Sequence, residues 1–283
     1  MINTTLSFEN ASFTRVLWAD APIPGELVGL DAAQISAVPW ANESLASGDQ
    51  VTVGVAAWVA DIGGRRIVFD PLQAADAFLR GDPDTEAAVQ ADMDAKFAAA
   101  GFPVESIDAV LLTHIDGIGM VARRSADAWG PFFPNARILM SGAELEAYRS
   151  ALAAGEGLDE PGTAMLVEAY NALLAADLID TFADGAELAT GLTARHTGGH
   201  GPGHVVFDYT ENGQCLATFL GHLAVSPLHL ATGPCEPLNV DPAHAWKALS
   251  AIADEGNLLI GPLWPSPGCG RFGEAGFEAA AAA

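Results

Sequence analysis

Three histidines lie where the chain can present side chains from loops. His114 and His222 each follow an apolar segment, and His200 lies in a glycine-rich turn directly after one. Imidazole is the commonest metal ligand in proteins, and because it titrates near neutral pH it also serves as a general acid or base. Loops on a rigid scaffold often carry function, so these positions favour a metal-binding or acid–base site.

The glycine-rich turn, TGGHGPGH at residues 197–204, is the most specific of these segments. Glycine allows a positive φ and a close backbone approach, so the turn can direct an imidazole inward without crowding. The other four histidines are expected to be structural or supporting: His196, His204, His229 and His244. Among them, His204 is the best candidate to support the turn itself.

Hydrophobic periodicity predicts the elements that position these side chains. Residues 51–60 and 66–69 are expected to form a hairpin that turns at 61–64. A strand at 108–112 delivers His114 to its carboxyl end, where α/β layers usually place their chemistry. The other expected elements are helices at 84–100, 142–153, 163–176 and 242–255, and strands at 136–140, 193–196, 205–209, 216–220 and 258–260.

The order of these elements predicts a single α/β domain over residues 1–283. Antiparallel strands come first, then helix and strand in alternation, then strands and a helix again. This order indicates two mixed sheets packed together with helices outside them. The expected architecture is a four-layer αββα sandwich.

Composition argues against polyanionic partners. The chain has 36 acidic and 12 basic residues and a formal charge of −24, which repels nucleic acid and anionic membrane surfaces. We therefore expect a solvated acidic surface and a small-molecule substrate as the partner, with a homodimer left open. No apolar stretch reaches the roughly 18 residues of a membrane span, and the N-terminus lacks a signal pattern. A cytoplasmic location is expected.

The three cysteines predict no covalent framework. Cys215, Cys235 and Cys269 are odd in number and lack zinc-type spacing. We expect each of them to be a small apolar side chain rather than a nucleophile.

Five segments together resemble the metallo-β-lactamase fold hydrolases. They are VLLTH at 110–114, FPNAR at 133–137, the turn at 197–204, LGH at 220–222 and GPLWPSPGCG at 261–270. Their order and spacing run from about residue 50 to residue 272, which is most of the chain. The resemblance is closest to the branch that contains lactonases, and it implies the αββα sandwich with metal held between the edges of the two sheets.

The resemblance implies ligands residue by residue. Family members have T-H-x-H-x-D-H in the first loop, where this chain has THIDGIG. Aligned without gaps, His114 matches the first ligand and Asp116 stands in place of the second histidine. His200 occupies the ligand position of the glycine-rich turn, and His222 replaces the bridging aspartate of a later G-D motif.

The departures from the family pattern fall on one of its two metal positions. Ile118, Gly119 and Leu263 replace the ligands that bind only the second metal, and none has a side chain that holds a cation. The first position keeps four groups able to ligate: His114, Asp116, His200 and His222. The resemblance therefore implies a mononuclear site.

A gap in the first loop changes this assignment. If the loop lacks two residues, Asp116 matches the family's aspartate, and metal binding rests on His114, His200 and His222. Asp70, at a strand end where the family often has D-T-G, is expected either to orient a ligand or to close a turn.

The ligand set predicts a hydrolase that uses one divalent metal ion. Imidazole and carboxylate suit zinc best, with iron or manganese as alternatives. Such an ion lowers the pKa of a bound water and polarises the carbonyl of a lactone, ester or amide. Asp116 or His222, whichever is not a ligand, is then the candidate catalytic base.

Two other functions stay open. A His-x-Asp pair with a distant histidine is also the ligand set of mononuclear non-haem iron oxygenases, and some members of the fold use one iron. A metal-free binding protein would instead hold a small molecule in an aromatic-lined pocket. The candidate lining residues are Trp58, Trp129, Trp264 and Phe272.

Overall fold

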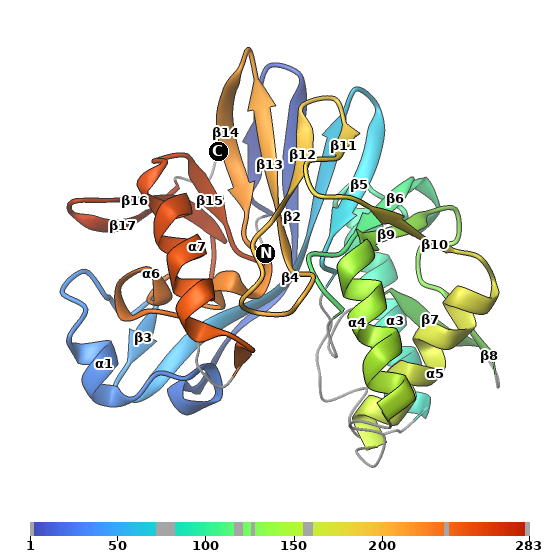
Figure 1. Cartoon of the computed structure of the whole chain (residues 1–283), viewed down its shortest axis with the longest axis horizontal. Coiled ribbons are helices and arrows are strands. Elements are labelled where there is room, and N and C mark those ends of the chain that lie inside the picture. The colour runs from blue at the N-terminus through green and yellow to red at the C-terminus, as the bar shows by residue number, and fades with distance from the viewer. Residues whose placement is uncertain are drawn as a thin grey trace.

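The structure, a computed structural model, describes residues 3–71, 83–115, 121–125, 128–154, 161–234 and 238–280. Two β-sheets dominate it (Figure 1). The first sheet has eight strands. In spatial order they are β1 (Thr5–Ser7), β2 (Ala11–Pro24), β4 (Gln50–Ile62), β5 (Arg65–Phe69), β6 (Ala109–Leu111), β9 (Arg137–Ser141) and β10 (Ile179–Phe182), with β3 (Ala46–Ser47) paired to β4.

The second sheet has seven strands, in the same order in space as in sequence. They are β11 (Glu187–Ala189), β12 (Leu192–His196), β13 (Val205–Glu211), β14 (Gln214–Phe219), β15 (Leu258–Ile260), β16 (Cys269–Gly273) and β17 (Gly276–Ala279). Both sheets are mixed, because β5, β6, β9 and β10 pair in parallel in the first and β14 pairs in parallel with β15 in the second.

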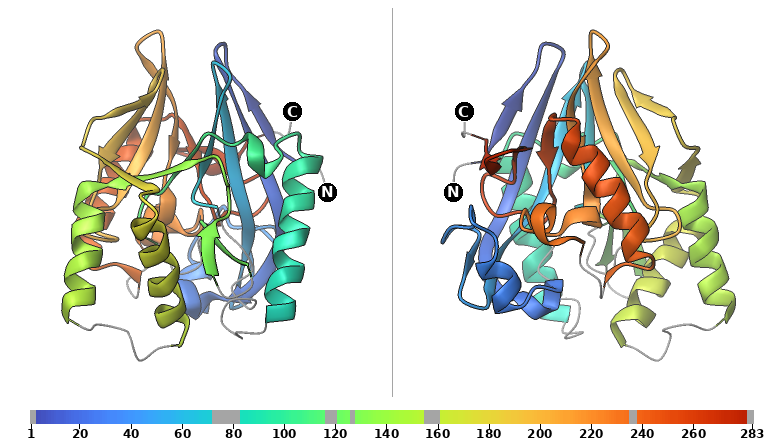
Figure 2. Two further views of the ribbon diagram at one scale, coloured as in Figure 1. Left: turned by 90° about the vertical axis from the view of Figure 1, so that its right-hand side faces the viewer. Right: turned by 60° about the vertical axis from the view of Figure 1, so that its left-hand side comes forward.

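Helices cover the outer faces of the two sheets, as the turned views show (Figure 2). Beside the first sheet lie α3 (Pro83–Ala99), α4 (Gly142–Ala154) and α5 (Pro161–Ala175), and beside the second lie α6 (His229–Thr232) and α7 (Pro242–Asp254). The shorter elements are η1 (Gly25–Val28), α1 (Ala32–Ser36), η2 (Val104–Ser106), η3 (Gly221–Ala224) and a separate hairpin of β7 (Ala122–Ser125) and β8 (Ala128–Pro131) against α5.

Three buried clusters fill the spaces between these layers. The cluster between the two sheets includes Phe13, Phe69 and Phe207. A second packs the first sheet on its helices, and a third packs the second sheet on α7 through residues such as Leu249. Burying one such side chain contributes about 1.5–3 kcal/mol, so the three contact regions together fix the stacking of the layers. The predicted αββα sandwich is confirmed.

The predicted elements are all present, with ends shifted by at most two residues. The expected hairpin is β4 and β5, joined through Gly63 and Gly64. The long strand β2 was not expected from the sequence; it pairs with β4 from Ala11 opposite Ile62 to Pro24 opposite Gln50. Strands β10 and β11 and the hairpin of β16 and β17 were not expected either.

The predicted aromatic pocket is wrong for two of its four residues. Trp58 and Trp264 are fully buried, because the first faces the other sheet and the second packs beside α7. The Trp264 indole nitrogen also donates a hydrogen bond to the Ala224 carbonyl at 2.7 Å. Trp129 and Phe272 are half-buried at the margins of the core.

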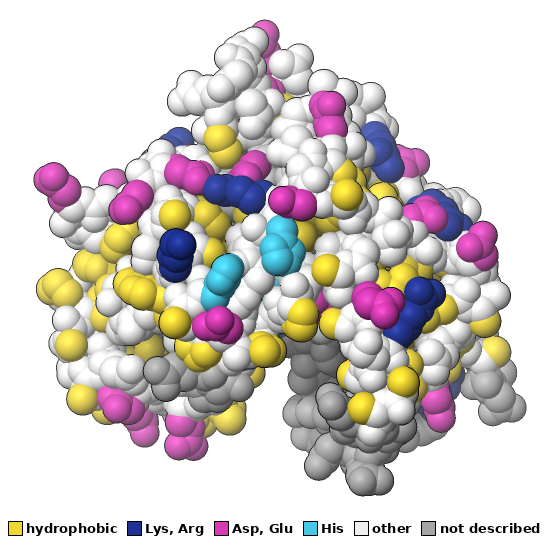
Figure 3. Space-filling view, viewed as in Figure 1, with side chains coloured by type: hydrophobic (Ala, Val, Ile, Leu, Met, Phe, Trp, Pro, Cys, Tyr) yellow, Lys and Arg dark blue, Asp and Glu magenta, His cyan; other side chains and the backbone are white. Residues whose placement is uncertain are grey.

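Many of the acidic side chains lie on the surface, and the two described cysteines are not joined in a disulfide. Acidic side chains are scattered over the face in Figure 3 rather than gathered in one patch, and basic side chains lie beside several of them. Cys215 and Cys269 are both free, and Cys235 lies outside the described residues. Within the described part of the chain, no helix has the length and apolar character needed to cross a membrane.

Candidate metal centre

Three loops meet at one edge of the sandwich, each directly after the carboxyl end of a strand. Residues 112–115 follow β6 and carry His114, the turn at 197–204 follows β12 and carries His200, and η3 follows β14 and carries His222. The first loop is tied to the end of the turn, because the amide of Val205, the first residue of β13, donates to the Thr113 carbonyl at 3.0 Å.

The structure brings His114, His200 and His222 together. Each offers one ring nitrogen, and these three nitrogens all lie within 4.8 Å of one another. The ring centroids are 4.5 Å apart for His114 and His200, 4.7 Å for His114 and His222, and 5.5 Å for His200 and His222. His114 and His222 are buried, and His200 is half-buried. Ring nitrogens grouped in this way could hold one metal ion.

The environment keeps two of these imidazoles neutral. Burial lowers the pKa of His114 well below its ordinary value, and the neighbouring His222, His200 and His204 lower it further. Burial, followed by the nearby His222, lowers the pKa of His200 to about 3, against a hydrogen bond with Asn239 that raises it. A histidine must be neutral to bind a metal ion, so this donor set fits a divalent cation.

Asp70 and Thr113 orient His114. The Asp70 carboxylate accepts the Thr113 amide at 2.8 Å and the Thr113 hydroxyl at 2.5 Å. The same hydroxyl oxygen lies 3.0 Å from Nδ1 of His114. Because the hydroxyl has only one hydrogen, which goes to Asp70, its oxygen accepts from Nδ1–H, and the lone pair of the neutral His114 ring is then on Nε2. Of the two predicted roles for Asp70, the contacts fit that of orienting a ligand.

His204 supports the glycine-rich turn. Its Nδ1 lies 2.8 Å from the Thr197 hydroxyl, which also donates to the His204 carbonyl at 3.2 Å. The ring is fully buried, 5.3 Å from the His200 ring and 5.5 Å from the His114 ring. It stands behind the three-histidine group rather than within it.

Gly221 lets His222 reach the centre. Its φ of 56° lies in the left-handed region, and a Cβ there would stand 2.3 Å from the Thr113 hydroxyl and 2.8 Å from Nε2 of His204. Only glycine tolerates both the backbone conformation and this approach. The turn from β14 into η3 therefore requires a glycine at position 221.

The second metal position of the resemblance is not formed by the residues that the structure describes. Leu263 packs beside a buried cluster that includes Val28, Val51 and Leu228. Asp116, Ile118 and Gly119 lie outside the described residues, so the proposed ligand or base role of Asp116 stays a prediction.

The remaining histidines have structural positions. His229 is fully buried, with Nε2 2.9 Å from the Val28 carbonyl and Nδ1 accepting from the Ser226 amide at 3.2 Å. His196 and His244 are exposed, and Nε2 of His196 lies 2.9 Å from the Pro202 carbonyl. Sequence analysis missed Thr113 and Glu144, although the pattern Ser-Gly-Ala-Glu at 141–144 marked a helix start.

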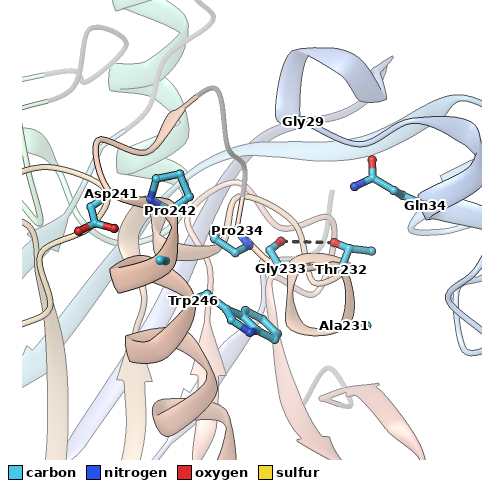
Figure 4. A pocket seen from close by; sticks show the side chains of 10 residues that line it. Gly29, Gln34, Ala231, Thr232, Gly233, Pro234, Asp241, Pro242 and Trp246 are labelled. Carbon is cyan, nitrogen blue, oxygen red and sulfur yellow. Dashed lines mark hydrogen bonds between the residues drawn. The ribbon is translucent and has the colours of Figure 1, made fainter.

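An open pocket of about 870 Å³ lies beside the loop that follows α6 (Figure 4). Trp246, Pro242 and Gln34 are among its described lining residues, and none of the three clustered histidines is. A backbone hydrogen bond joins one of its lining residues to the turn of His200, because the Asp241 amide donates to the Gly199 carbonyl at 2.8 Å. The clustered histidines, and not this pocket, are therefore the candidate site for chemistry.

Solved structures match this chain over almost its whole length. The hydrolase AbOPH in the β-lactamase superfamily has a TM-score of 0.74 at 19% identity, covering 99% of this chain and 97% of that chain. The dizinc quorum-quenching lactonase AidC has a TM-score of 0.70 at 16% identity, with 98% and 96% covered. A probable metal-dependent hydrolase from Staphylococcus aureus has a TM-score of 0.70 at 12% identity, with 97% of both chains covered.

No family model matches the sequence, and a search of curated proteins finds no match. The likeness rests on the three-dimensional arrangement of the two sheets and their helices, which extends over the full sandwich. The chain therefore has the metallo-β-lactamase fold.

Proposed function

We propose that this chain is a metal-dependent hydrolase of a small carbonyl compound, a lactone, ester or amide. The observation that carries the proposal is the group of three imidazole nitrogens within 4.8 Å of one another. Its place after the carboxyl ends of β6, β12 and β14 is where sheets of this kind carry their chemistry. Solved structures of this fold that are hydrolases or lactonases support the same reaction class.

His114, His200 and His222 would hold one divalent ion, with zinc favoured by an all-imidazole set. When bound, such an ion supplies Lewis acidity, which polarises a carbonyl group and makes water more acidic. The protein's own contribution is to hold three neutral imidazoles in place. Burial and the chain of contacts from Asp70 through Thr113 do this for His114.

A single metal ion is the second part of the proposal. The described residues group three ligands around one point, and Leu263 packs away in a buried apolar cluster. A three-histidine set with an open position is sufficient for hydrolytic zinc sites. The three ligands of the gapped alignment, His114, His200 and His222, are the three grouped here, and the ungapped alignment adds Asp116 to them.

Asp116 is the proposed general base. It follows His114 by two residues, and His222, the other candidate base, is grouped with the ligands. A carboxylate within reach of a water at the open position would accept its proton. The proposed partner is a small molecule, since a chain with a formal charge of −24 repels polyanions.

The test is hydrolysis of a panel of lactones, aryl esters and amides by the zinc-loaded protein. Activity should fall to background in His114→Ala and His200→Ala, and by about 10²-fold or more in Asp116→Asn if it is the base. The exposed His244→Ala is the matched control and should retain the wild-type rate. Equal rates in the wild type and both ligand variants would rule out the proposed site.

A further inference from the structure

The first turn of α4 touches two of the three ligand loops. Glu144 lies in this turn and is only 8% exposed. Its Oε1 accepts the Ile115 amide at 2.9 Å, one residue after His114. Its Oε2 accepts the Gly203 amide at 3.1 Å, three residues after His200. One carboxylate therefore joins loops that are far apart in the sequence.

Ser141 completes the same contact. Its hydroxyl accepts the Glu144 amide at 3.0 Å and donates to the Gly203 carbonyl at 2.6 Å. A Ser-x-x-Glu pattern ordinarily folds its glutamate back onto the amide of the serine. Here the serine still caps the helix, but the glutamate extends to the loops. The helix start thus meets both the amide and the carbonyl of Gly203.

The fit between α4 and the glycine-rich turn is close. A Cβ at Gly203 would stand 2.1 Å from the Glu144 amide nitrogen and 2.4 Å from its Cα. A Cβ at Gly201 would stand 3.5 Å from Oε2 of Glu144. Gly203 therefore lets the turn lie directly against the helix start, whereas the distance at Gly201 is an ordinary contact.

Burial of the Glu144 carboxylate carries a desolvation cost, which its hydrogen bonds must offset. It raises the pKa of Glu144, while the hydrogen bonds from the Ile115 and Gly203 amides lower it. A buried carboxylate is tolerated only where its oxygens are hydrogen-bonded, and a buried amide needs an acceptor. Loss of Glu144 would leave two amides beside the ligand loops without this acceptor.

We propose that Glu144 is a positioning residue that fixes the loop of His114 against the loop of His200. It holds the spacing of the two imidazoles before any metal ion binds. This inference rests on the proposed metal centre for its functional meaning. The geometric part, that Glu144 joins the two loops, is tested without metal.

The test uses Glu144→Gln, which keeps the size of the side chain and one acceptor oxygen but directs an amide group at the other N–H. Glu146→Gln, an exposed position on the same helix, is the matched control. The first measurement is the zinc dissociation constant, by competition with a chromophoric chelator. We expect Glu144→Gln to bind zinc about 10–100-fold more weakly, and Glu146→Gln to bind as the wild type does.

The second measurement is amide hydrogen exchange in the metal-free protein. Glu144→Gln should speed exchange at Ile115 and Gly203 while leaving the strands of the sandwich protected. Wild-type zinc affinity in Glu144→Gln would overturn the proposal, even if this variant unfolds at a lower temperature than the wild type. If the wild type itself binds no zinc, the proposed function fails. Unchanged exchange at the Ile115 and Gly203 amides would separately refute the proposal that Glu144 joins the two loops.

Discussion

Thr113 links Asp70 to His114 through one hydroxyl group. The hydroxyl donates to the Asp70 carboxylate at 2.5 Å, and its oxygen lies 3.0 Å from Nδ1 of His114. Through the intervening hydroxyl, the carboxylate thereby sets the ring orientation and the protonated nitrogen of a candidate ligand. Groups of this kind behind a ligand commonly decide how tightly a metal ion is held.

Thr113→Val should weaken metal binding, although valine has nearly the same side-chain shape as threonine. The valine removes the hydroxyl but keeps the backbone amide that donates to Asp70. We expect about 10–100-fold weaker zinc binding and a loss of roughly 1–3 kcal/mol in the free energy of unfolding, because the Asp70 carboxylate loses a buried donor. Chelator competition and urea unfolding measure the two effects. Thr232→Val in α6, which removes a hydroxyl that donates a hydrogen bond to the Leu228 carbonyl, should lower stability without changing zinc affinity.

Gly221→Ala should be more destabilising than an alanine at another positive-φ glycine. Gly213, with a φ of 77° and nothing within 4 Å of its Cβ position, is the matched control. Gly213→Ala should cost about 1–2 kcal/mol for the backbone conformation alone. Gly221→Ala adds a contact of 2.3 Å with Thr113 and should cost more. Equal losses in urea unfolding would show that η3 does not pack against Thr113 as described.

Stability should fall as the pH drops below neutral, in part because of His229. Burial lowers the pKa of His229 to about 4 from 6.5, against the hydrogen bond to Val28 that raises it. The unfolded chain therefore takes up this proton first as the pH falls. The stabilisation is complete above about pH 6.5 and is lost as the pH approaches 4, by about 3 kcal/mol in all.

The measurement is urea unfolding of the metal-free protein across this range, for the wild type and His229→Gln. The variant lacks this titration, so its stability should change less with pH than that of the wild type. Parallel pH profiles for the two proteins would contradict the assignment to His229.

Leu263→His should not create a second metal site. Leu263 packs beside the buried cluster around Val51 and Leu228, so an imidazole there replaces apolar packing. We expect a loss of about 1–3 kcal/mol in the free energy of unfolding and an unchanged zinc stoichiometry by elemental analysis. A second bound equivalent of zinc would show that the second metal position is intact apart from this residue.

The fold was predictable because its strands and helices have clear periodicity and are separated by turn residues. The hairpin over Gly63 and Gly64 is one example, and the helix capped by Asp241 is another. Strand β2 could not be predicted from the sequence, because Arg15 and Asp20 interrupt its apolar pattern. Arg15 is 1% exposed, and its two terminal nitrogens donate to the Ser266 hydroxyl and the Trp264 carbonyl, partners about 250 residues away that no local pattern reveals.

The candidate site was predictable only in part. His114, His200 and His222 each stand in a recognisable loop, and the structure brings them together. Glu144 was missed because its sequence pattern fits an ordinary helix cap, and only the packing of α4 on the turn at 197–204 gives its carboxylate other partners. Contacts between loops on different sheets depend on the stacking of the layers, which local sequence does not encode.

The most direct test of the metal centre is the number and identity of metal ions bound by the pure protein. Metal-free protein titrated separately with zinc, iron(II) and manganese should bind one equivalent, with zinc the tightest, and the affinity should collapse in His114→Ala, His200→Ala and His222→Ala. Iron as the preferred ion, with oxygen uptake, would favour an oxygenase instead. A folded protein that binds none of the three ions, or binds them equally without these histidines, would contradict the account.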